Sequence, residues 1–420
     1  MEEVSTEMTK RFTGLVAIGA AGLLAVTAAV PALAQDKTSI EMIAAQYTDE
    51  MQPYFDDLAA RFMEENPDVD VTVQVVNWND IDQVVTTRIA TGEPPDIANL
   101  NYFAAFAADD LLYTAEEIVD EATLADLIQG FRDNSKFEGT EFAVPDLASD
   151  RLFFYNTAIL EAAGVEPPAT WSEVKAVCQA ILDTQPGVVP LALPLGPEEA
   201  QAEFLIWAGG NGGQYFDGSD WVVNSAENLE TLNYLQELVD MGCTQPNPGS
   251  FNRTEGAFQL FGEGIVGMLN GAIFLPGELE NTYQSDVEWG VVPFPAADGK
   301  ESITLGVQDY FFGFKNEDGS NQEAIQRFLS FLFIPDNYAA FLEAAGGFLP
   351  ATVSAGESMS NDPFLAPFIE VLPSAIFYPS DQAAWGSVQG AIQDGIGAAF
   401  VPGADKQQIL DEINAVGEGS

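Results

Sequence analysis

Apolar residues recur along the first third of this chain with two different spacings. Three short apolar runs have the length of buried strands, and the segments between them carry apolar positions at helical spacing. The predicted strands are residues 38–46, 71–76 and 96–100. The predicted helices are residues 51–65 and 78–90.

Strands that alternate with helices predict an α/β fold with a parallel sheet that is covered on both faces. Ligands bind such sheets at the carboxyl ends of the strands. The loops at residues 47–50 and 99–102 are therefore the first places where we expect a site.

A second set of elements follows a predicted strand at residues 151–155. Thr170 and Glu173 have the spacing of a capping box, which predicts a helix over residues 171–182. A hairpin with an Asp-Gly turn is predicted at residues 215–223. Later elements are an amphipathic helix at 228–241, a strand or strand pair at 302–314, and helices at 322–333, 335–345, 361–372, 383–398 and 406–416.

Residues 265–269 (IVGML) read as a short buried strand, which we expect to break at Asn270-Gly271-Ala272. Gly271 lacks the Cβ that would keep a ligand away from the backbone. Pro276 is suited to open a new helix whose first N–H groups point back at the break. The alternative to a ligand site here is that these residues form a core strand and a tight turn without any role in binding.

Five segments in order along the chain resemble the extracellular solute-binding protein family 1, the proteins that feed sugar ABC importers and include maltose-binding protein. They are PPDIANLN at 94–101, FAVPDLASDRLFFYN at 142–156, PPATWSEV at 167–174, FQLFGEGIVGMLNGAIF at 258–274 and GGFLPA at 346–351. No single segment is specific, but their order over most of the chain is a strong signal.

The resemblance implies a two-lobed α/β periplasmic binding protein fold of type II, like that of maltose-binding protein, with three hinge crossings. We expect residues 35–147 plus 302–350 to form the N-terminal lobe, and residues 148–301 plus 351–420 the C-terminal lobe. A length of 420 residues also favours two domains. A cleft between two lobes is a natural place to bury a small ligand by closure.

Residues 1–34 have the features of a cleavable signal peptide. Lys10 and Arg11 precede an apolar run at 14–30, and Ala32 and Ala34 form a small-x-small cleavage site. A retained membrane anchor is the alternative, and translation from Met8 would explain the acidic residues ahead of the basic ones. No Cys follows the signal, so we expect a periplasmic protein without a lipid anchor.

The formal net charge is −51, which opposes binding to nucleic acid or to anionic membranes. Histidine is absent, which excludes Ser-His-Asp and Cys-His catalysis, and no Walker A or GxGxxG motif is present. We therefore expect a monomeric binding protein, not an enzyme, with no cofactor and no metal. Cys178 and Cys243 either form a disulfide, which an oxidising compartment permits, or remain thiols.

A sugar-binding site needs an aromatic side chain on which the sugar ring can stack, called a plate below, and surrounding polar groups, called the rim, that form hydrogen bonds with the sugar hydroxyls. Trp385 is the strongest plate, because its neighbours on the predicted helix are small and because the resemblance places a sugar-stacking Trp there; its alternative is packing in the core. The weaker plates, each with a core role as its alternative, are Tyr47, Trp207, Phe274 and Phe348.

The polar rim is predicted from loops at strand ends and from the crossing, at Asp49, Asn101, Asp150 and Arg151. The resemblance adds Gln308 and Asp309. The alternatives are solvated surface carboxylates and, for Arg151, an ion pair between lobes. The resulting prediction is capture of a neutral mono- or oligosaccharide for an ABC permease. The second hypothesis is that the protein carries a cation such as a polyamine. The third hypothesis is that it is a secreted structural protein.

Overall fold

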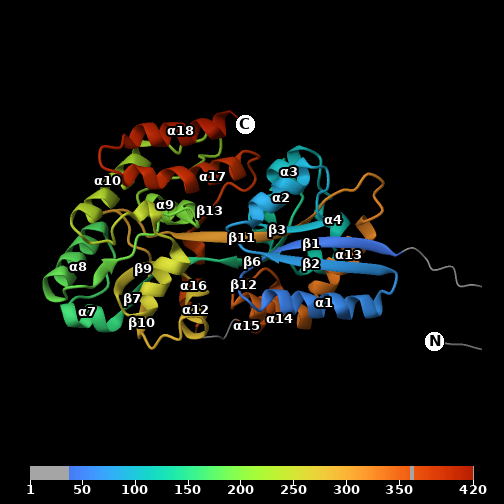
Figure 1. The fold of residues 1–420 in the computed structure, drawn as a ribbon, viewed down its shortest axis with the longest axis horizontal. Coiled ribbons are helices and arrows are strands. Elements are labelled where there is room, and N and C mark those ends of the chain that lie inside the picture. Colours follow the sequence, from blue (N-terminus) through green and yellow to red (C-terminus); the bar gives the residue numbers. More distant parts are fainter. Residues whose placement is uncertain (1–36, 360–363, 420) are drawn as a thin grey trace, which may run out of the picture. The chain divides into compact units, whose positions relative to one another are not determined.

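The computed structural model describes residues 37–359 and 364–419 (Figure 1). From Lys37 onward the chain forms one compact unit. The predicted signal peptide at residues 1–34 lies outside the described residues. Among the helices that are described, none combines the length and the apolar character needed to cross a bilayer.

The larger sheet contains the first three predicted strands, but it is mixed and not parallel throughout. Its main path runs β12 (Leu349–Pro350), β6 (Val144–Ser149), β11 (Thr304–Gly313), β3 (Ile97–Leu100), β1 (Thr38–Ala45) and β2 (Val69–Val76). Strands β2 and β3 pair parallel to β1, whereas β11 pairs antiparallel with both β3 and β6. All ten residues of β11 are buried, so this late strand completes the middle of the sheet.

The second sheet runs β10 (Trp289–Val292), β7 (Arg151–Asn156), β9 (Val266–Ala272) and β8 (Val189–Leu191). The predicted break at Asn270-Gly271-Ala272 is wrong, because Asn270 pairs with Phe153 and Gly271 with Leu152. Strand β9 continues to Ala272, and α12 (Leu275–Asn281) then begins with Pro276 in its first turn, as predicted.

Several local predictions match the helices. Helix α1 (Met51–Glu65) has the predicted bounds. Helix α8 (Trp171–Thr184) begins with the predicted capping box, in which the Glu173 backbone N–H donates to Thr170 Oγ1 at 3.3 Å. The predicted hairpin is reduced to one bridge between Phe216 and Trp221. The helix predicted at 361–372 lies partly outside the described residues, and α16 is Ala366–Val371.

Helices flank both sheets (Figure 1). Those that follow the strands of the larger sheet are α2 (Ile81–Ala90), α3 (Ala104–Ala108), α13 (Gln322–Leu332) and α14 (Pro335–Ala345). Those that belong to the later segments are α7 (Thr157–Ala163), α9 (Ala200–Gly209), α10 (Ala226–Asp240), α17 (Trp385–Gly395) and α18 (Lys406–Glu418).

One of the passages of the chain between the sheets takes a single residue. Strand β6 ends at Ser149 in the larger sheet and β7 begins at Arg151 in the second, so Asp150 alone connects them. Strand β13 (Ala375–Phe377) pairs with the start of β11 and so joins the larger sheet late in the chain. The lobe boundaries stated above remain predictions.

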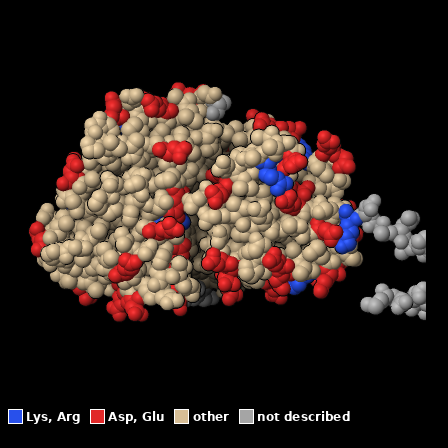
Figure 2. Space-filling view, viewed as in Figure 1, with Lys and Arg blue, Asp and Glu red and all other residues tan. Residues whose placement is uncertain are grey.

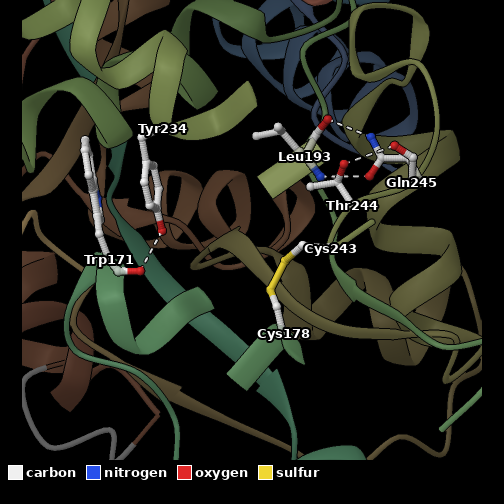
Figure 3. The surroundings of a disulfide bond; sticks show 7 residues. All are labelled: Trp171, Cys178, Leu193, Tyr234, Cys243, Thr244 and Gln245. Atoms are coloured by element: carbon white, nitrogen blue, oxygen red, sulfur yellow. Dashed lines mark hydrogen bonds between the residues drawn. A yellow bond between two sulfur atoms is a disulfide. The ribbon is translucent and has the colours of Figure 1, made fainter. Parts of the chain in front are cut away.

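Cys178 and Cys243 form a disulfide with a Cα–Cα distance of 5.4 Å (Figure 3). The bond ties α8 to the segment that follows α10. Nearby, Trp171 stacks on Tyr234 with ring centroids 4.0 Å apart, and the Gln245 side chain bonds both the backbone N–H and the carbonyl of Leu193. The disulfide therefore reinforces a region that is already densely packed.

Replacing both cysteines by serine is expected to lower the free energy of unfolding by about 2–4 kcal/mol, because the bond closes a long loop in the unfolded chain. The two cysteines are 65 residues apart in sequence. Urea denaturation of the wild type and of the Cys178→Ser/Cys243→Ser variant measures the difference. A reducing agent should destabilise the wild type alone, and equal stability of the two proteins would contradict the prediction.

Candidate functional site

Four polar side chains meet near the carboxyl ends of β1 and β3. Tyr47 follows β1, and its hydroxyl donates to Asp309 Oδ2 on β11 at 2.9 Å. The same hydroxyl lies 3.4 Å from Asp146 Oδ2, on β6. Asn99, on β3, donates from Nδ2 to Asp146 Oδ2 at 2.9 Å. The carboxyl groups of Asp146 and Asp309 thus both lie within hydrogen-bond distance of the Tyr47 hydroxyl.

Both of these carboxyl groups are almost completely buried. Burial, which disfavours the charged form, raises the pKa of Asp309 to about 7. Burial also raises the pKa of Asp146 well above its usual value, and the Asp309 carboxylate adds to this shift. Both groups therefore favour the protonated form more than exposed carboxyl groups do.

A second network belongs to the other sheet. The Arg151 guanidinium, at the start of β7, is 3% exposed and donates to Glu199 Oε1 at 2.6 Å. Arg253 pairs with the other oxygen of Glu199 and also with Glu198. Burial acts to raise the pKa of Glu199, but the two guanidinium groups hold it below its usual value.

Glu203, on α9, is buried beside this ion-pair network. It accepts hydrogen bonds from Trp207 Nε1 and from Asn270 Nδ2, each at 2.9 Å. Among the described residues, none with a positive charge forms an ion pair with Glu203, and burial raises its pKa to about 7. The hydrogen bond to Glu203 therefore holds the side chain of Asn270, which lies on β9. Asn270, Arg151 and Glu199 line one small cavity.

Aromatic rings connect the two networks. The Arg151 guanidinium lies over the Phe274 ring, 5.7 Å from its centroid. Phe274 stacks on Phe348 at 5.1 Å, and Phe348 meets Tyr47 edge-on at 5.2 Å. The two networks and these rings form what we call the central cluster. Its members are Tyr47, Asn99, Asp146, Arg151, Glu199, Glu203, Arg253, Asn270, Phe274, Asp309 and Phe348.

Several buried polar atoms in and beside the central cluster have no hydrogen-bond partner within the described part of the chain. They include four acceptors, namely both carboxylate oxygens of Asp150, Oδ1 of Asp309 and Oδ1 of Asn270, and one donor, Nε of Arg253. An unpaired buried acceptor costs about 1–3 kcal/mol. A ligand that carries hydrogen-bond donors would satisfy the four acceptors.

The structure thus brings together five of the predicted site residues, namely Tyr47, Arg151, Phe274, Asp309 and Phe348. Asp150 is adjacent to Arg151 in the chain and is fully buried. Arg151 forms an ion pair with Glu199, which lies in the same predicted lobe, so this pair is not the one between lobes that was the stated alternative.

Other predicted site residues have structural partners elsewhere. Gln308 donates to the Phe131 carbonyl at 2.9 Å and accepts from Asn134. Trp207 is fully buried and packs edge-on against Phe294 at 4.8 Å.

A Cβ on Gly271 would lie 2.2 Å from the Phe154 ring, so this glycine makes room for core packing. Asp49 is exposed and accepts from the Gln46 side chain at 2.9 Å. Asn101 is half-buried just after β3.

Trp385, the predicted sugar plate, is fully buried at the start of α17. The Tyr378 ring stacks on it with centroids 4.9 Å apart, and Tyr215 lies 5.9 Å away. The indole face is therefore covered in this conformation, and its role in binding remains a prediction.

The sequence did not single out Asp146, Glu199, Glu203 and Arg253 as site residues, whereas Asn99 and Asn270 lie in segments where a site was expected. One signal was available for Arg253, because the whole chain has only 14 Lys and Arg residues against 65 Asp and Glu. Figure 2 shows this imbalance, with acidic side chains spread over the visible face and few basic ones among them. A buried cation in such a chain is expected to have a specific partner.

Comparison with known proteins gives consistent matches. A family model described as "Bacterial extracellular solute-binding protein" matches residues 45–339. A putative binding protein of Brucella abortus is 29% identical over 369 residues, which cover 86% of this chain and 88% of the relative.

Solved structures match over nearly the whole chain. Maltose-bound MalE3 of T. maritima aligns with a TM-score of 0.77 at 20% identity, covering 91% of this chain and 99% of the other. The ABC substrate-binding protein Lmo0181 of Listeria monocytogenes, in complex with cycloalternan, aligns with a TM-score of 0.75 at 22% identity and the same coverage. The chain thus has the two-lobed α/β fold of these proteins, as predicted.

The buried carboxyl groups make the stability depend on pH. A carboxyl group with a raised pKa in the folded state stabilises fully below its unfolded pKa of about 4, and that contribution is lost as the pH rises through about 7. We expect the free energy of unfolding to fall between pH 5 and pH 8.

Asp150 offers a clean test, because burial raises its pKa to about 7 and neither oxygen has a partner to lose. The Asp150→Asn variant should gain stability over the wild type by about 2 kcal/mol between pH 5 and pH 8. Denaturant melts at both pH values measure this gain. The exposed control Asp109→Asn should show no such change, and an equal pH slope in all three proteins would refute the assignment.

Proposed function

Because this chain belongs to the bacterial extracellular solute-binding protein family, the solute-binding components of ABC transporters, we propose that it captures a neutral mono- or oligosaccharide between its two lobes. It then delivers the sugar to permease subunits in the inner membrane. Residues 1–34 direct export to the periplasm, where the protein works as a monomer. The maltose and cycloalternan bound in the similar structures support a sugar as the ligand class.

The observation that carries this proposal is the set of unpaired acceptors in and beside the central cluster. Asp309 lies on the larger sheet and Asn270 on the second sheet, and each has one buried oxygen without a donor. Sugar hydroxyls are donors that suit these oxygens. Phe274 and Phe348 offer apolar surface for a ring face, and Arg151 provides the donors of a charge-assisted hydrogen bond.

A cationic ligand is the second candidate, and the composition of the central cluster favours it. Asp146, Glu199, Glu203 and Asp309 outnumber the two guanidinium groups of Arg151 and Arg253. An ammonium group offers only donors, as unpaired carboxylate oxygens require. The raised pKa values of Asp309 and Glu203 weigh against it, because protonated carboxyl groups attract cations less strongly.

Thermal-shift assays separate the two ligand classes, because a ligand that binds only the folded state raises the melting temperature. We expect at least one member of a panel of glucose, maltose, maltotriose and cellobiose to raise it by several degrees at millimolar concentration. Putrescine and spermidine should have no effect. A shift with the polyamines alone would replace the sugar proposal by the second candidate.

Closure provides a further prediction, because the acceptors come from both sheets and are paired by one ligand only when the lobes approach. Small-angle scattering of the protein with a saturating bound sugar should give a smaller radius of gyration than the ligand-free protein. Identical scattering, with binding shown in parallel by calorimetry, would rule out capture by closure.

A further inference from the structure

The inference concerns Tyr378, which lies against the predicted sugar plate. Its ring stacks on Trp385 at 4.9 Å with 25° between the ring planes, and Trp385 is fully buried. A planar aromatic ring thus covers the indole in the manner in which a sugar ring would.

The surroundings of this stack contain polar atoms that the described residues leave without partners. Trp385 Nε1 is buried without an acceptor, and Gln389 Oε1, one turn further along α17, is buried without a donor. Buried polar atoms in a permanent core almost always find partners. A donor and an acceptor near each other, both unused, match a hydroxyl, which can serve both.

Tyr378 also lies at the edge of the central cluster. Burial raises the pKa of its phenol, and Glu199, Arg151 and Asp309 are close enough to influence it. The ring therefore occupies a place between the plate and the charged groups to which the proposed ligand would bind.

An open pocket of about 220 Å³ adjoins the same segment. Its walls include both chain neighbours of Tyr378, namely Phe377 and Pro379, together with Ile376, Tyr215 and Phe216. A cavity of about 150 Å³ is enough to hold a benzene ring. The pocket is therefore large enough to receive a phenol ring.

We propose that the Tyr378 ring takes the place of a ligand ring on Trp385 and rotates into the adjacent pocket when the ligand binds. The segment can allow this, because β13 is only three residues long and the chain from Tyr378 to Ala384 belongs to no regular element. The Ser380 hydroxyl, two residues beyond the ring that moves, is held by a hydrogen bond with the Tyr310 hydroxyl at 3.2 Å. This inference rests on the proposed sugar-binding function.

If the proposal is right, the Tyr378 ring competes with the ligand for the face of Trp385, and two substitutions test this together. Tyr378→Ala removes the competing ring, and Ile376→Trp fills the pocket into which that ring would rotate. We expect Tyr378→Ala to tighten the binding of maltose or maltotriose by about three- to tenfold, the scale of one aromatic pair. Ile376→Trp should weaken binding in the wild type but have no effect in the Tyr378→Ala background.

The measurement is the Kd from calorimetry for the wild type, both single variants and the double variant, with thermal melts to show that each is folded. Ile334→Trp, which adds an indole at an exposed position, is the matched control and should leave the Kd unchanged. Weaker binding by Tyr378→Ala, or an equal effect of Ile376→Trp in both backgrounds, overturns the role of Tyr378 alone. Absence of sugar binding to both the wild type and Tyr378→Ala overturns the proposed function with it.

Discussion

The burial of Arg151 is the constraint on which the site depends. A guanidinium group cannot lose its charge in a protein, so its burial at the start of β7 requires a paired carboxylate. Glu199 fills this role and is itself shared with Arg253. The shared ion pair therefore fixes the residues that precede α9 against β7. Because Arg151 follows the crossing residue Asp150 directly, the same pairing sets the direction in which the chain enters the second sheet.

The other charged groups of the central cluster follow a different rule. Among the described residues, no guanidinium group pairs with Asp146 or Asp309, and burial favours the protonated form of both. In the same part of the chain, Glu203 accepts hydrogen bonds from the neutral donors Trp207 and Asn270. A core selected for stability alone would not retain so many unpaired acceptors. Their concentration where β7, β9 and β11 approach each other is what the proposed ligand explains.

Local features of the fold were predictable from the sequence because they depend on near neighbours. The bounds of α1 follow from its helical spacing and from Asn66-Pro67, and the start of α8 follows from Thr170 and Glu173. The antiparallel insertion of β11 was not predictable, since its partners β3 and β6 lie far away in the sequence. The continuation of β9 through Gly271 was missed because the pairing with Leu152 overrides the local break signal.

The same distinction separates the site residues that were predicted from those that were missed. Tyr47 was found because it directly follows a predicted strand, Asp150 because it lies at the predicted crossing, and Asp309 because of the family resemblance. Glu199 and Arg253 were missed because each becomes significant only through a partner about fifty residues away in sequence. Trp385 was predicted as a plate from its own small neighbours, whereas its exposure is decided by Tyr378 from the segment before it. Sequence patterns thus identify which side chains suit a ligand, but long-range packing decides which of them the ligand reaches first.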